Sequence, residues 1–136
     1  MAAFIYLADA TNSDKAASGT PNLLLDSGPE YWFLYRYFEA ANLDRRHELV
    51  DLYGGGLIEG YQLNRLEAEL NQALSDIESR PGTWNVLVGW SSETRSAATE
   101  DWRPLEKSVV RATIQAFLDI IHIGSKSGLT LVVSGD

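Results

Sequence analysis

Few residues in this chain have the types and spacing that acid–base chemistry needs. Asp119 and His122 lie three positions apart, so a helix would place both side chains on one face. A carboxylate there could orient the imidazole as a general base, although such a pair is more often a local hydrogen bond or a charge effect at the helix end. The other histidine, His47, follows two arginines and is expected to be solvated. The enzyme alternative is therefore a small hydrolase or transferase with an acidic site at the carboxyl end of the predicted sheet, acting through Glu93, through Asp101 or through the candidate acid/base pair Asp119 and His122.

Other catalytic and cofactor patterns are missing from the sequence. The chain has no cysteine, which excludes thiol catalysis and cysteine-built metal sites. The segment 89–92 follows an apolar run but lacks the second glycine of a serine nucleophile elbow. The glycine-containing segments 54–56 and 124–128 do not have the Gly-Lys-Ser/Thr order of a phosphate-binding loop. No histidine spacing fits a zinc site, so we expect no metal and no cofactor.

Carboxylates could meet in one further arrangement. If the first strand were parallel to two later strands, Asp9, residues 91–93 and Asp136 would converge at one edge of the sheet. Clustered carboxylates can hold Mg²⁺ or share a proton. The simpler explanation is that polar residues follow strands where the chain enters solvent.

A polar stretch over residues 91–103 is the main candidate binding segment. It mixes charges of both signs with one large aromatic side chain, the composition of an anchored protein contact. The tryptophan could instead be a hydrophobic staple for a helix opened by Pro104. The candidate binding residues are Glu93, Arg95, Glu100, Asp101 and Trp102.

The elements around this stretch predict a strand, a crossover helix and a second strand. Residues 83–90 and 129–133 are rich in β-branched and aromatic residues, and between them an apolar-faced helix could open at Pro104 and close at Gly124. Such a unit normally joins two parallel neighbouring strands, with the stretch 91–103 as a loop at their carboxyl end.

The rest of the chain predicts more helices and a small sheet. Residues 3–8 read as a buried strand and 23–25 as a short edge strand. We expect helices after a capping box of Ser27 and Glu30, over 44–53 and over 61–78, where leucines form an apolar stripe. The prediction is an α/β or α+β fold in a single domain, 1–136, with a three- to four-stranded sheet and a C-terminal strand-helix-strand unit preceded by three or more helices.

Composition limits the partners. The net charge is −8, so a nucleic-acid partner is disfavoured, and the acidity serves either solubility or attraction to a basic protein partner. The amino terminus has no basic segment before its apolar run, and no apolar run is long enough to span a membrane. We expect a cytoplasmic protein without a membrane partner.

The overall pattern resembles small bacterial immunity proteins, which bind and block polymorphic toxins. The likeness lies in size, acidity, aromatic content and segments such as Asp-Leu-Tyr-Gly at 51–54 with Glu-Gly at 59–60, Trp-Asn-Val-Leu-Val-Gly at 84–89 and the ending Val-Ser-Gly-Asp. It implies a non-enzymatic cytoplasmic binding protein that occludes a toxin. The alternatives are the hydrolase or transferase above, and a homo-oligomeric structural protein with the aromatic residues 31–38 at a homodimer face.

Overall fold

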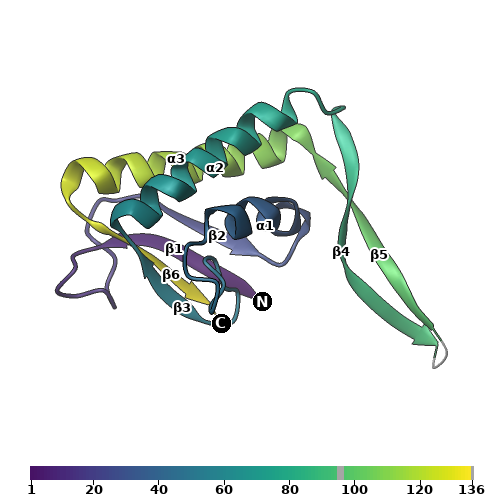
Figure 1. Cartoon of the computed structure of the whole chain (residues 1–136), viewed down its shortest axis with the longest axis horizontal. Coiled ribbons are helices and arrows are strands. Elements are labelled where there is room, and N and C mark those ends of the chain that lie inside the picture. The colour runs from purple at the N-terminus through teal and green to yellow at the C-terminus, as the bar shows by residue number, and fades with distance from the viewer. Residues whose placement is uncertain (95–96, 136) are drawn as a thin grey trace.

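The protein has an α+β fold, seen in a computed structural model that describes the backbone of residues 1–94 and 97–135 and their side chains except 91–94 and 97–98. In chain order the elements are β1 (Ala2–Ala8), β2 (Asn22–Asp26), α1 (Pro29–Ala41), β3 (Gly55–Ile58), α2 (Gly60–Ile77), β4 (Thr83–Thr94), β5 (Ala97–Glu106), α3 (Lys107–Ser127) and β6 (Thr130–Gly135). Figure 1 shows the three helices layered over one face of a sheet, with β4 and β5 extending away from both layers.

The main sheet has four strands in the order β2-β1-β6-β3, and every neighbouring pair is antiparallel. Side chains alternate across the sheet. Ile5, Leu7 and Leu131 therefore join the main core under the helices, whereas Tyr6 and Val132 form a small cluster on the opposite face. The expected first strand and edge strand are confirmed, and the predicted sheet of three to four strands is present.

The helical layer is held by apolar stripes. In α2 the expected stripe is buried, with Leu66 and Leu70 fully inaccessible to solvent, and α3 contributes Ile114 and Phe117. The period of these stripes matches that of an α-helix, so one face of each helix reaches the core. Gly128 ends α3 in the left-handed conformation, four residues beyond the predicted end at Gly124.

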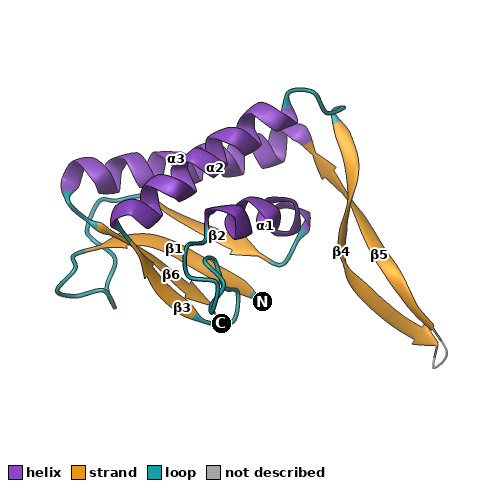
Figure 2. Ribbon diagram, viewed as in Figure 1, coloured by secondary structure: helices purple, strands orange, loops and turns teal. Residues whose placement is uncertain are grey.

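The second sheet is the two-stranded hairpin of β4 and β5, shown in Figure 2 as two long strands that leave the helices. The predicted parallel pairing of residues 83–90 with the last strand is wrong, because β4 pairs antiparallel with β5. Residues 91–103 are not a loop, and α3 begins at Lys107 rather than Pro104. Pro104 lies inside β5 opposite Asn85, a position that an outer strand tolerates because the missing N–H need not join a ladder. The chain nevertheless ends in a strand-helix-strand unit, β5-α3-β6.

Two predicted helix features are wrong. Residues 44–53 form no helix, so two helices and not three precede α3. Asp44 binds the backbone N–H of Arg46 and so favours a local turn over a helix cap. The capping box also fails: Gly28 is the N-cap of α1, and the N–H of Ser27 donates to the carbonyl of Met1.

The conditional carboxylate cluster does not form. Because β1 and β6 are antiparallel, Asp9 follows the end of β1 that pairs with the start of β6, at Ala8 and Thr130. Asp9 thus lies at the opposite end of the sheet from Gly135, and residues 91–93 belong to the hairpin. Asp136 is outside the described residues.

Candidate functional site

The base of the hairpin is fixed to the body by aromatic and backbone contacts. The rings of Trp84 in β4 and Phe33 in α1 meet edge-to-face at 5.4 Å, and the Arg80 guanidinium lies 5.1 Å from the first ring centre and 5.4 Å from the second. The N–H of Lys107 donates to the carbonyl of Gly82 at 2.8 Å, which closes the two ends of the hairpin. These contacts set where the hairpin leaves the body.

The outer part of the hairpin presents aromatic side chains on one face. Leu87 is paired with Trp102 and Trp90 with Glu100, with a bulge in β4 between Leu87 and Gly89. Residues directly opposite each other, and residues two apart on one strand, share a face of a ribbon. We call the four side chains of Leu87, Trp90, Glu100 and Trp102 the tryptophan face.

The tryptophan face is open to solvent. Trp90 is 64% exposed and Trp102 is 53% exposed, which is unusual for the largest apolar side chains. The indole N–H of Trp102 donates to the Glu100 carboxylate at 2.8 Å, so the ring and the charge are held together. Exposed tryptophans with a polar rim have the composition of a protein-interaction hot spot.

The structure brings most of the candidate binding residues together on this hairpin. Glu100, Asp101 and Trp102 are consecutive in β5, and Asp101 forms an ion pair with Arg103 at 3.3 Å on the ribbon face opposite Trp102. Glu93 lies in β4, whose backbone is described there, and Arg95 falls outside the described residues. Trp90 is missing from the predicted binding residues because the sequence places it at the end of a strand over 83–90, and no sequence signal sets it apart until its pairing with Glu100 is known. Trp102 is not a staple for α3, since it lies within β5.

The candidate acid/base pair lies elsewhere, on α3. Asp119 and His122 are both exposed, and Nε2 of His122 is 3.6 Å from the Glu67 carboxylate of α2. The carboxylate beside His122 is therefore that of Glu67, and a catalytic role for Asp119 with His122 stays a prediction. Neither side chain lines the cavities formed by residues 35–50, by residues 9–18, or by residues 59–64 with 124–130.

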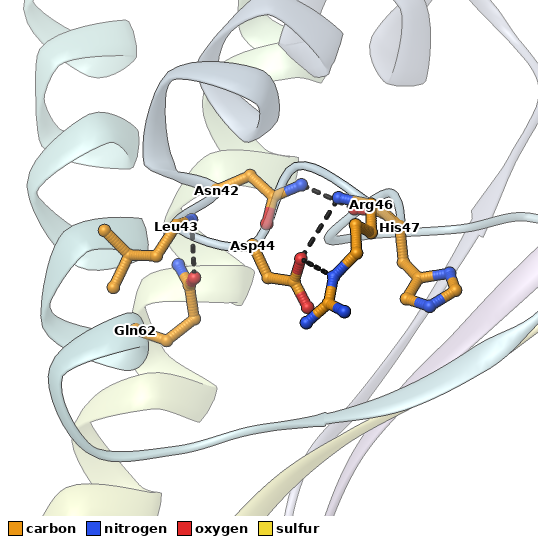
Figure 3. Close-up of polar contacts among 6 residues, drawn as sticks. All are labelled: Asn42, Leu43, Asp44, Arg46, His47 and Gln62. Atoms are coloured by element: carbon orange, nitrogen blue, oxygen red, sulfur yellow. Dashed lines mark hydrogen bonds and ion pairs between the residues drawn. The ribbon is translucent and has the colours of Figure 1, made fainter.

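The loop after α1 is a second candidate site, and side-chain hydrogen bonds connect its residues to one another and to α2 (Figure 3). The Asn42 amide donates to the carbonyl of His47 at 2.6 Å, and the Asp44 carboxylate accepts from the backbone and the guanidinium of Arg46 at 3.1 and 3.2 Å. The N–H of Leu43 donates to the Gln62 amide oxygen at 2.9 Å, which fastens the loop to α2.

This loop and α1 enclose a cavity of about 270 Å³. Phe38 and Val50 supply apolar walls, while Arg45, Glu39 and Glu48 place both signs of charge around it. The Tyr35 hydroxyl donates to Glu48 at 2.8 Å, and this hydrogen bond raises the pKa of Tyr35 to about 12. Because the charges are mixed, they do not select a ligand of one sign.

The described residues form neither a metal cluster nor a membrane-spanning helix. No group of three or more acidic or histidine side chains is arranged to hold a metal ion there. None of the described helices combines the length and the apolar character that crossing a bilayer requires.

Comparison with models of protein families, with curated proteins and with solved structures gave no match to this chain. The function therefore has to be argued from the geometry, and the tryptophan face is the feature with the clearest chemical character.

Proposed function

We propose that this chain is a non-enzymatic binding protein that holds a basic protein partner against the tryptophan face of its hairpin. In its most specific form the proposal is a cytoplasmic immunity protein that blocks a cognate bacterial toxin by occlusion. The observation that carries it is the exposure of Trp90 and Trp102 on one face of a ribbon that projects from the body.

The apolar area of this face would contribute to the free energy of binding. A tryptophan buries on the order of 150–250 Å² when it enters an interface. More than half of each ring is available on this hairpin. At roughly 25 cal/mol per Å², covering each ring contributes on the order of 2–3 kcal/mol before the cost of association.

The charge of the chain favours a basic partner. The whole chain carries −8, and residues 83–106 hold four acidic and two basic residues, a local balance of −2. Opposite charge raises the rate of encounter and excludes acidic competitors, and its effect weakens as salt increases. A basic surface with an apolar pocket would complement both features of the hairpin.

The test is capture from a lysate of the native host, with tagged wild-type protein, the double variant W90A/W102A and the control Tyr61→Ala. Tyr61 is 68% exposed on α2, away from the hairpin, so the control removes an exposed aromatic ring of similar accessibility. We expect a basic protein that elutes at moderate salt from wild type and control and is absent from the double variant. Equal capture by the double variant would overturn the proposal.

The occlusion step has its own test. The activity of the captured partner should fall as wild-type protein is added, and the partner's substrate should compete with the hairpin for binding. A partner that remains fully active when saturated would leave a binding function and remove the immunity function.

A further inference from the structure

The two outer edges of the hairpin differ in chemistry. Among its ten residues β5 carries four charged side chains and Pro104, features that natural sheets use to prevent strand addition. Among its twelve residues β4 carries one charge, Glu93, and no proline. The edge of β4 therefore lacks the charges and the proline that protect β5 from an added strand, although two bulges, at 87–89 and 91–94, interrupt it and leave residues 89–91 as its regular part.

The backbone of β4 is free to accept such a strand. Its ladder runs to β5 alone, and within the described residues no backbone–backbone hydrogen bond joins β4 to any other element. Two-stranded ribbons are marginal by themselves, and a third strand would supply the missing hydrogen bonds. Beyond the first bulge, residues 89–91 form a regular edge of roughly 10 Å around Trp90 before a second register shift between Ser91 and Thr94.

We propose that an extended segment of the partner adds to the free edge of β4 as a third strand, with a lysine or arginine beside Trp90. This proposal rests on the proposed function and specifies how the partner is held. Backbone hydrogen bonds between the added strand and β4 would provide affinity. Contacts between the side chains of the added strand and those of the tryptophan face would select the partner sequence.

The row of side chains that neighbour each other across the strands at Trp90 explains the preference for a cation. Trp90 is paired with Glu100, so a residue added on the other side of β4 would be the third member of that row. A cation there would lie against the indole ring of Trp90, where the ring quadrupole attracts it. The Glu100 carboxylate, which accepts from the indole N–H of Trp102 at 2.8 Å, lies two strand spacings or roughly 10 Å from the added residue and adds only to the negative charge of this face.

The experiment uses the full chain and a short acetylated peptide in which lysine and valine alternate, followed by amide exchange. We expect the outward amides of residues 89–91 to gain protection when the peptide binds, while those of β5 do not. The matched peptide with glutamate in place of lysine should not bind. Trp90→Ala should weaken the lysine peptide by about two- to five-fold, the range of an exposed cation–π contact, and the control Tyr61→Ala on α2 should not.

The other outcomes are distinct. Strand addition to β4 would be overturned if the β5 amides gained protection. It would also be overturned if the lysine peptide failed to bind while partner capture still depended on Trp90 and Trp102. Either result would leave the proposed function intact. Protection of β4 amides in the concentrated protein alone, lost on dilution, would identify a second copy as the occupant and also overturn the addition of a partner strand. If partner capture is independent of the tryptophans, the proposed function itself falls.

Discussion

Three tyrosine hydroxyls allow an unusually aromatic helix to be buried on several sides. Tyr31 of α1 donates to the carbonyl of Val50 at 2.9 Å, and Tyr37 donates to the Asp76 carboxylate of α2 at 2.7 Å. Tyr35 is the third, through its bond to Glu48. Each ring brings apolar area to a contact while its hydroxyl finds a polar partner. The aromatic segment therefore fastens α1 to its neighbours, and only Trp32 among its rings is markedly exposed.

At the scale of single residues, Tyr31→Phe should destabilise the protein by about 1–3 kcal/mol. The substitution leaves the buried carbonyl of Val50 without its donor, and an unsatisfied buried acceptor has that cost. Tyr35→Phe is the matched control, because its lost bond to Glu48 is exposed and water can replace it. Urea denaturation of the two variants measures the difference. Equal destabilisation by both substitutions would contradict the claim that the buried hydrogen bond from Tyr31 to Val50 stabilises the protein.

The same tyrosines predict a loss of stability at alkaline pH. Burial raises the pKa of Tyr31 and of Tyr37, and the bond to Glu48 raises that of Tyr35 to about 12. In the unfolded chain these groups titrate near pH 10. Their contribution is therefore complete below about pH 10 and is lost as pH rises through the folded-state values. Denaturant midpoints should fall between about pH 10 and 12, whereas an unchanged midpoint would refute the prediction.

At the scale of elements, the end of β6 is packed directly against backbone. A Cβ at Gly135 would lie 2.6 Å from the carbonyl oxygen of Asp51 and still closer to that of Gly54. The N–H of Gly135 also donates to the carbonyl of Gly54. Since backbone atoms cannot move aside as a side chain can, this position requires glycine.

Gly135→Ala should therefore separate the end of β6 from residues 51–54 and lower stability by about 1–3 kcal/mol, the usual cost of overpacking. The control is Gly56→Ala in β3, where a Cβ would meet nothing within 4 Å. Thermal unfolding of both variants checks the difference. A Gly135→Ala protein with wild-type stability and unchanged amide exchange at 51–54 would show that the contact is not needed.

Elements with one regular apolar face were predictable. The leucine stripe of α2 and the apolar run of β1 indicated both elements, because each buries a face whose period appears in the sequence. The hairpin was not predictable in the same way. Most of β5 is exposed, so its polar residues follow no alternation, and Pro104 more commonly opens a helix than lies within a strand.

Only part of the candidate site was predictable, because composition appears in the sequence and strand register does not. The aromatic and charged composition around Trp102 marked a contact segment without any knowledge of its conformation. Trp90 could be added only once the register was known, because its pairing with Glu100 is what places both tryptophans on one face.

At the scale of the whole molecule, stability and binding are divided between two parts. The core lies between the helices and the four-stranded sheet, and the described hairpin side chains that it buries, Val86 and Leu105, come from the hairpin base. The outer hairpin, by contrast, carries the exposed tryptophans. Shortening the hairpin should thus remove binding at little cost to folding.

The corresponding variant replaces residues 88–101 with Asn-Gly, which joins Leu87 to Trp102. These two residues are paired across the ladder, so a two-residue turn can connect them. We expect a free energy of unfolding within about 1 kcal/mol of wild type, because the buried base remains. Calorimetry and circular dichroism measure this, and a variant that fails to fold would show that the outer hairpin supports the core.

The most direct test of the account is the affinity of the captured partner for Trp90→Ala and Trp102→Ala, measured by titration calorimetry beside the control Tyr61→Ala. Each tryptophan variant should bind at least about ten-fold more weakly, the loss expected of a hot-spot residue, while the control binds within about two-fold of wild type. Wild-type affinity in both tryptophan variants would contradict the claim that the hairpin's tryptophan face is the binding surface.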